Sequence, residues 1–133
     1  IEWMERKTGV ILMPPVLGIG IIDGDGLLCG GHALHPVTAS TLEWSLYSDR
    51  AMTHGVTKAF FRHVFEVLDV HRLQIRTHRK NRAINRVAPK AGFKFEGLAR
   101  GYWGPGEDAN IYCMTRDQCR WIARRTATEE MAA

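Results

Sequence analysis

Short apolar stretches separated by turn residues predict strands in the first third of the chain. Residues 16–22 and 27–35 are of this kind, and the Asp-Gly-Asp-Gly sequence between them, at 23–26, is typical of a tight hairpin. Gly30-Gly31 indicates a bulge in the second strand, and Pro36 is expected to end that strand. The hairpin is therefore the first element of a predicted sheet.

A third strand at 41–48 shows the clearest alternation in the chain. Leu42, Trp44 and Leu46 fall on one face, while Glu43, Ser45 and Tyr47 fall on the other. One face of this strand is therefore apolar and the other polar.

Helical periodicity dominates the middle of the sequence. Apolar residues spaced three and four apart predict a helix over 56–68. Asn81 is a good N-cap for a second helix at 82–91, which Gly92 closes. Pro89 lies inside this helix, removes a backbone donor and is expected to cause a kink or an early end.

The remaining elements complete an alternating order. Further strands are predicted at 73–77, 93–102 and 109–114, the last two joined by Gly104-Pro105-Gly106. Residues 1–7 are typical of the end of a helix closed by Gly9. Thr115 and Gln118 form a capping-box pattern that is expected to open a last helix reaching about Arg125.

The resulting order, β-β-β-α-β-α-β-β-α, indicates an α/β (α+β) fold: a mixed sheet with helices on its faces. The length of 133 residues fits a single domain over 1–133, with a core at about 16–122 and a frayed tail at 126–133. The chain begins with Ile1 rather than Met, which indicates a trimmed or incomplete product.

Composition places the chain among ordinary globular proteins, with 45% hydrophobic and 24% charged residues. No apolar run approaches the roughly 20 residues of a membrane-spanning helix, and no membrane partner is expected. The three cysteines (Cys29, Cys113 and Cys119) lack metal-ligand spacing. They predict reduced thiols in a cytoplasmic protein without a metal site.

Positive charge is concentrated in one block. Between residues 70 and 95 there is no acidic residue, whereas eight basic ones occur: Arg72, Arg76, Arg79, Lys80, Arg82, Arg86, Lys90 and Lys94. Such a block holds a polyphosphate or nucleic acid, or is only a solvated face. The lack of aromatic residues between Arg72 and Lys90 argues against base stacking.

The junction between the alternating strand and the first long helix, Tyr47 to Val56, is the most informative segment. A strand that passes through a short loop into a helix leaves N–H groups without partners at the positive end of the helix dipole. Gly55 would let a phosphate approach the backbone closely. This junction is therefore a candidate anion site.

Several motifs, taken together, resemble the GCN5-related N-acetyltransferases. Arg50-x-x-Thr53-x-Gly55 is similar to their R/Q-x-x-G-x-G/A pyrophosphate loop, with Thr53 replacing the first glycine. Their next signature resembles Asn81 followed by Gly92-Phe93, then Glu96-Gly97 and Arg100. The strand Glu43 to Tyr47, the segment Glu107 to Met114 and the sequence Cys119-Arg-Trp121 are similar to the ribosomal-protein N-acetyltransferase branch and its phage-encoded members.

The resemblance implies the family's acyl-CoA N-acyltransferase fold, with a short N-terminal part, and an enzyme that transfers acetyl from acetyl-CoA to a primary amine in a ternary complex. It implies cofactor contacts by Leu46, Tyr47, Arg50, Met52, Thr53, His54, Gly55, Val56 and Asn81. The amine is that of a protein N-terminus, a lysine or a small molecule, and a ribosome-associated substrate and a homodimer are left open.

Glu43 is the candidate general base, because a lysine amine has a pKa near 10.4 and must lose its proton before attack. Many family members protonate the leaving sulfur with a tyrosine at the position of Ala88, so Tyr112 or Ser45 is the candidate acid here. Two alternatives stay open: a catalytically silent relative that binds CoA or a partner, and a basic nucleic-acid-binding module.

Overall fold

A computed structural model describes residues 1–9, 12 and 15–123, and contains a six-stranded sheet in the order β1-β2-β3-β4-β6-β5. The strands are β1 (Leu17–Ile22), β2 (Leu28–Thr38), β3 (Thr41–Ser48), β4 (Arg72–His78), β5 (Lys94–Ala99) and β6 (Ala109–Thr115). β3 and β4 are parallel, and every other neighbouring pair is antiparallel. The predicted mixed sheet is confirmed.

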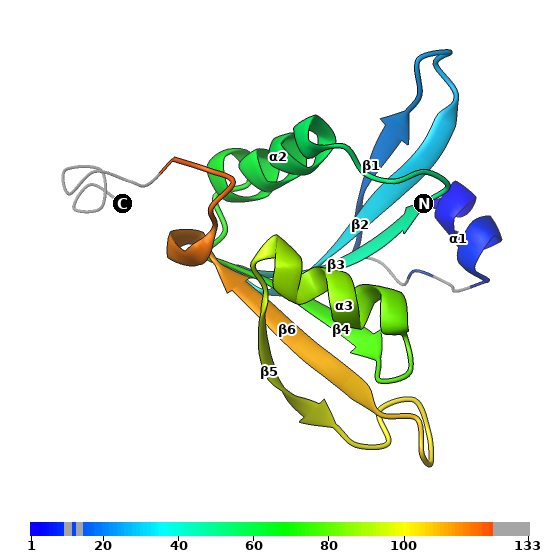
Figure 1. Cartoon of the computed structure of the whole chain (residues 1–133), viewed down its shortest axis with the longest axis vertical. Coiled ribbons are helices and arrows are strands. Elements are labelled where there is room, and N and C mark those ends of the chain that lie inside the picture. Colours follow the sequence, from blue (N-terminus) through cyan, green and yellow to red (C-terminus); the bar gives the residue numbers. More distant parts are fainter. Residues whose placement is uncertain (10–11, 13–14, 124–133) are drawn as a thin grey trace.

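The helices are α1 (Glu2–Thr8), α2 (His54–Arg62) and α3 (Arg82–Ala91). A π-helical turn, His63–Val67, continues α2, and a 3₁₀ turn, Arg116–Gln118, follows β6. α2 leads from β3 to the parallel β4, and α3 leads from β4 to β5. Both crossovers step along the sheet in one direction, so right-handed connections place both helices on the same face (Figure 1).

The core fills the space between this face and the two helices. Its buried members come from α2 and its π turn, from α3 and from β2, β4 and β6; they include Phe60, Phe61, Val64, Phe65, Leu34, Leu73, Tyr112, Met114 and Ala88. Leu42 and Trp44 of β3 are partly buried against the same cluster, as their alternation predicted.

The opposite face of the sheet is polar toward its centre and is partly covered by α1. Met4 of α1 is buried against β2, where a Cβ added to Gly31 would lie 3.0 Å from the Met4 side chain. The Trp3 ring meets the Tyr47 ring edge-on at 5.6 Å. Gly9 closes α1 in the left-handed conformation, as predicted.

Two predictions about the first hairpin are wrong in detail. β2 continues through Pro36 to Thr38, because β1 ends its pairing at Leu34 and leaves β2 with one neighbour there, where proline is tolerated. The register shift lies between Ile21 and Ile22, opposite Cys29, and not at Gly30-Gly31.

The prediction of a last helix reaching Arg125 is also wrong. The capping box of Thr115 and Gln118 is present, but it opens only a single 3₁₀ turn that ends at Gln118. Trp121 then packs on Phe61, and this tertiary contact replaces a further turn. The predicted tail at 126–133, like Arg125 itself, lies outside the described residues.

A kink or an early end was predicted for the second helix at Pro89, and the early end does not occur. α3 extends past Pro89 to Ala91, and Gly92 and Phe93 both donate backbone hydrogen bonds to Ala88. These bonds close the final turn, so the lost donor of Pro89 does not end the helix.

Candidate functional site

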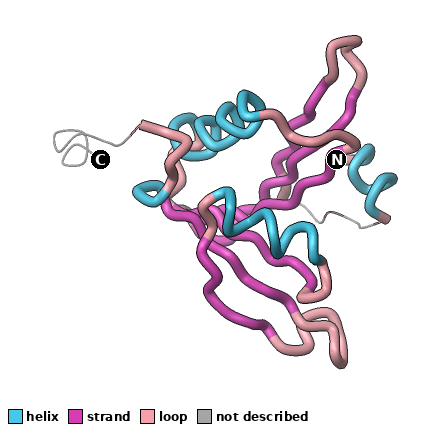
Figure 2. The backbone as a smooth tube through the Cα atoms, in the orientation of Figure 1, coloured by secondary structure: helices cyan, strands magenta, loops and turns pink. Residues whose placement is uncertain are grey.

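The parallel pairing of β3 and β4 is short. It comprises Thr41 with Arg72, Leu42 with Leu73 and Glu43 with Gln74, after which the two strands diverge. Both continue, β3 to Ser48 and β4 to His78. Figure 2 shows the two halves of the sheet separating from this point, with a helix crossing the gap.

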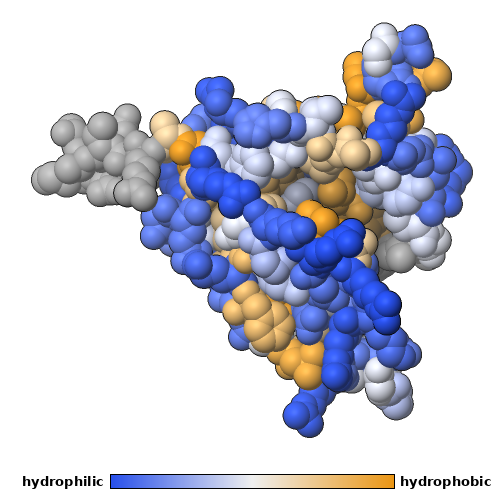
Figure 3. All heavy atoms as spheres, in the orientation of Figure 1, coloured by the Kyte–Doolittle hydropathy of each residue, from blue (hydrophilic) through white to orange (hydrophobic). Residues whose placement is uncertain are grey.

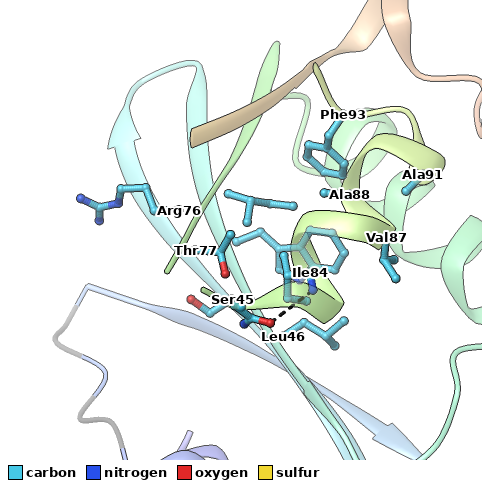
Figure 4. A pocket seen from close by; sticks show the side chains of 12 residues that line it. Ser45, Leu46, Arg76, Thr77, Ile84, Val87, Ala88, Ala91 and Phe93 are labelled. Carbon is cyan, nitrogen blue, oxygen red and sulfur yellow. Dashed lines mark hydrogen bonds between the residues drawn. The ribbon is translucent and has the colours of Figure 1, made fainter. Parts of the chain in front are cut away.

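A cavity of about 200 Å³ lies in this gap. β3 contributes Trp44, Ser45 and Leu46, and β4 contributes Ile75, Arg76 and Thr77. The third wall consists of the inner face of α3, its N-cap and Phe93 beyond its end: Asn81, Ile84, Val87, Ala88, Ala91 and Phe93 (Figure 4). The lining is mostly apolar with a few polar groups, the usual character of a small-molecule site.

Asn81 has two roles, as the N-cap of α3 and as a lining residue of the cavity. Its side-chain oxygen caps α3 by accepting a hydrogen bond from the Ile84 amide at 3.3 Å, and the residue also lines the cavity. The predicted N-cap is confirmed, and the cap fixes the side chain at the cavity wall.

The start of α2 provides backbone donors close to the end of β3. Thr53 is the N-cap, and its hydroxyl accepts from the Val56 amide at 3.2 Å. Val56 is therefore engaged by the cap, while His54 and Gly55 supply the first two amides of the helix, which have no intrahelical acceptor. A Cβ built on Gly55 meets no atom within 4 Å, so there is open space beside the helix at this position.

Other residues of the predicted anion loop point elsewhere. Arg50 is exposed and pairs with Asp23 of the β1–β2 turn, with 3.3 Å between Nη2 and Oδ2. The Tyr47 hydroxyl donates to Asp49, and this hydrogen bond raises the pKa of Tyr47. The His54 ring lies 5.2 Å from the Trp121 ring. Met52 is partly buried.

Glu43 is the last paired residue of β3 before the strands diverge. It is 8% exposed, accepts from Gln74 Nε2 at 3.0 Å and forms an ion pair with Arg76. The Arg76 guanidinium also lies 4.5 Å from the Tyr102 ring centroid. Glu43 is thus a buried carboxylate, oriented by two partners where the strands separate, and it is not among the residues that line the cavity.

The two candidate acids differ in position. Ser45 lines the cavity. Tyr112 is 4% exposed, lies beneath α3, and donates its hydroxyl to Asn85 Oδ1 at 2.8 Å. Among the residues that line the cavity, Tyr112 does not occur.

Asn85 is a positioning residue that the sequence interpretation missed. Besides Tyr112, its side-chain oxygen accepts from Asn110 Nδ2 at 2.9 Å. Its amide donates to the carbonyls of His78 and Arg79 at 3.2 and 3.0 Å. An asparagine one turn after the N-cap, on the side of the helix that faces the sheet, was the signal available in the sequence.

His32 lies on the core side of β2, beneath α2. It is 2% exposed, stacks on Phe60 at 4.1 Å and accepts from the Trp44 indole at 3.0 Å through Nδ1. Burial lowers the pKa of His32 to about 4, so the ring is neutral at pH 7.

Within residues 1–9, 12 and 15–123, no group of three or more His, Cys, Asp or Glu side chains is placed to hold a metal ion. No helix there is long and apolar enough to cross a membrane.

Comparisons with known proteins agree with this geometry. A family model described as an acetyltransferase (GNAT) domain matches residues 4–94, more than half of the chain. A comparison with curated protein sequences gave no match.

Solved structures share the fold. A GCN5-related N-acetyltransferase from Brucella melitensis is 26% identical, with a TM-score of 0.67 over 77% of this chain and 52% of its own. A mutant spermidine N-acetyltransferase from Vibrio cholerae is 14% identical (TM-score 0.71; 92% and 76% covered). A ribosomal-protein-S5-alanine acetyltransferase from Vibrio fischeri is 15% identical (TM-score 0.65; 92% and 69% covered). The chain thus spans about half the length of the Brucella protein.

Proposed function

The chain belongs to the GNAT acetyltransferase family, and from this premise we propose that it transfers an acetyl group from acetyl-CoA to a primary amine. The amine attacks directly while both substrates are bound. The finer resemblance to the ribosomal-protein and phage-encoded branch, and a cytoplasmic location, belong to the same proposal.

One observation carries the proposal: β3 and β4 separate after Glu43 and Gln74 and leave a cavity walled by α3. Parallel neighbours in a sheet normally continue their hydrogen bonding, so an early separation leaves backbone groups of both strands available to a ligand. The start of α2, which follows β3 through residues 49–53, supplies further backbone donors.

The residues present fit the cofactor. The His54 and Gly55 amides at the start of α2 would hold its pyrophosphate, because a helix N-terminus favours negative charge. The Leu46 backbone and Asn81 would hold the acyl and pantetheine part along the cavity. When bound, acetyl-CoA supplies an acetyl group activated as a thioester.

Glu43 takes the proton of the attacking amine, directly or through water. Gln74 and Arg76 keep the carboxylate at the origin of the gap. Because a thiolate is a tolerable leaving group, a strong acid is not required, and Ser45 is better placed than Tyr112 to hydrogen bond the leaving sulfur.

The acceptor side favours an amine with few positive charges. Carboxylates near the gap already have cationic partners: Glu43 pairs with Arg76, Glu96 with Arg72 and Asp108 with Arg79. The hydrogen bond from Arg72 lowers the pKa of Glu96. A polyamine would find few unpaired carboxylates there, whereas a protein N-terminus or a lysine brings a single charge.

Calorimetry with acetyl-CoA tests the proposal. Gly55→Glu places a carboxylate where the pyrophosphate is expected, and we expect affinity to fall at least about 10-fold, or about 1.4 kcal/mol. Gly55→Ala is the matched control, because its Cβ meets nothing within 4 Å. It should bind within about 3-fold of the wild type. Both variants should unfold near the wild-type temperature, since an acidic residue in the first turn suits the helix dipole.

The outcomes are distinct. Absence of wild-type binding at high micromolar acetyl-CoA would rule out both the proposed cofactor site and the proposed acetyltransferase activity. Binding without thiol release against a panel of peptides, lysine and polyamines would identify a silent relative. Equal acetyl-CoA affinity of the two Gly55 variants would show that the pyrophosphate does not bind at the start of α2.

A further inference from the structure

α3 has two contrasting sides. One side lines the cavity, and the other carries Arg82, Arg86 and Lys90, which are spaced by one helical turn each and are exposed. Lys80 precedes them and is exposed as well. The row therefore extends along the whole helix, a length of about 15 Å.

Arg120 extends the row beyond the end of α3. Its Nη2 donates to the carbonyl of Lys90, and its guanidinium lies 5.0 Å from the Trp121 ring centroid. We call these residues the α3 strip: Lys80, Arg82, Arg86, Lys90 and Arg120. Figure 3 shows hydrophilic surface in a continuous band across α3, beside the apolar surface of the cavity.

The charge of the strip is not compensated. Arg72, Arg76 and Arg79, which come earlier in the same acid-free block, each pair with a carboxylate. Among the described residues, no ion pair involves a member of the α3 strip. Its five cations exceed the formal net charge of +4, so the rest of the chain is close to neutral.

We propose that the α3 strip is a binding surface for a single strand of nucleic acid, held through its phosphates. A linear row of exposed, unpaired cations matches a linear polyanion and is the electrostatic footprint of nucleic-acid binding. Binding is independent of base sequence, because no exposed aromatic ring lies within the row and base edges are not read.

An acidic protein fits the strip less well. Protein interfaces depend on aromatic or aliphatic anchors in their centre and are depleted in lysine. The strip contains two lysines, and its aromatic neighbour Trp121 is already engaged, with its indole donating to the Ala91 carbonyl at 2.9 Å.

The phosphates of acetyl-CoA do not account for the strip. The proposed pyrophosphate position is at the start of α2, a different helix from the one that carries the strip. The one remaining phosphate of the cofactor would engage only part of a row that runs the whole length of the helix. Nucleic-acid binding by the strip is thus separate from the acetyltransferase activity, and either property can be absent while the other is present.

Fluorescence anisotropy with a labelled mixed-sequence 12-nucleotide RNA, over a series of salt concentrations, tests the proposal. With five phosphate contacts, the slope of log K against log salt is expected to be about −3.5. Arg82→Gln with Arg86→Gln should make the slope shallower by about 1.4. The control, Arg6→Gln with Arg100→Gln, removes the same charge from exposed positions elsewhere and should leave the slope unchanged.

Two parallel titrations decide between the alternatives. Polyglutamate of equal charge should bind at least about 10-fold more weakly than the RNA; equal binding would overturn the proposal in favour of an acidic protein. Acetyl-CoA affinity of the Arg82/Arg86 variant should stay within about 2-fold of the wild type. If the Arg82/Arg86 variant loses acetyl-CoA binding and the wild type does not bind RNA, the strip belongs to the cofactor site. Equal salt slopes for the two double variants would exclude the strip as a specific RNA-binding surface.

Discussion

α2 and α3 lie on the same face of the sheet, but different contacts hold them in place. α2 and its π turn insert Phe60, Phe61 and Phe65 into the core, and Phe60 stacks on His32. α3 buries only Ala88 fully and is tied down by the hydrogen bonds of Asn85.

This difference explains how one face of the sheet can hold both a core helix, α2, and a helix that forms a cavity wall, α3. Apolar packing is strong but not directional, so it fixes α2 while leaving its N-terminus open. Hydrogen bonds are directional, so they set the position of α3 as a wall of the cavity.

Phe61→Ala should lower the free energy of unfolding by about 4 kcal/mol, because it removes a fully buried ring from beneath α2. Urea unfolding followed by circular dichroism measures the loss. Phe95→Ala, at a ring that is 58% exposed, serves as the control and should cost below about 1 kcal/mol. Similar costs for the two variants would contradict the packing account of α2.

Acidification should weaken the α2 side through His32. Its folded pKa of about 4 lies below the unfolded value of 6.5, so the unfolded state binds more protons between these values. Stability contributed by the neutral ring is full above pH 6.5 and falls as pH drops toward 4, by about 3 kcal/mol in total.

Unfolding in urea at pH 7 and pH 5 measures this effect before most carboxylates titrate. His32→Leu should be less stable at pH 7, because the Trp44 indole loses its acceptor, but should show a much smaller change between the two pH values. An unchanged pH dependence in that variant would assign the effect to other groups.

Asn85→Ala should cost about 2–3 kcal/mol on the α3 side, because the buried Tyr112 hydroxyl and the two loop carbonyls lose their partner. The loss should also raise the KM for acetyl-CoA, since the cavity wall is no longer fixed. Asn81→Ala removes one capping bond and is expected to cost about 1 kcal/mol. A smaller cost for Asn85→Ala than for Asn81→Ala would refute the network.

Tyr112→Phe should have the smallest effect, about 1 kcal/mol of stability, because Asn85 keeps its bond from Asn110. We expect the turnover rate to stay within about 2-fold of the wild type, since the hydroxyl faces Asn85 and the residue does not line the cavity. A turnover rate that falls about 100-fold while stability stays normal would restore Tyr112 as the catalytic acid.

Local patterns in the sequence predicted most of the elements. The alternation at 41–48, the cap at Asn81 and the Gly92 stop all depend on neighbours a few residues away, and the structure places them as expected. The errors at Pro36 and after Gln118 share a different cause: each depends on which strand or ring lies beside the chain, which short-range patterns do not record.

The candidate site also contains residues that local patterns indicate and residues whose role depends on tertiary neighbours. Sequence motifs indicated Asn81 and Gly55, because capping and close backbone approach are local properties. Arg76 was interpreted only as part of a basic block, and its pairing with Glu43 depends on β3 and β4 being neighbours. Asn85 was missed because its partners come from β6 and the loop before α3.

Local sequence patterns alone predict the order of most elements, a helix over 56–68 after the alternating strand, and the concentration of basic residues between 70 and 95. Folding, by contrast, sets where β3 and β4 separate, which carboxylate lies at that point and which cations remain unpaired. The physical reason is range: caps and turns depend on residues that are adjacent in the chain, whereas strand separation and ion pairing depend on residues that folding brings together.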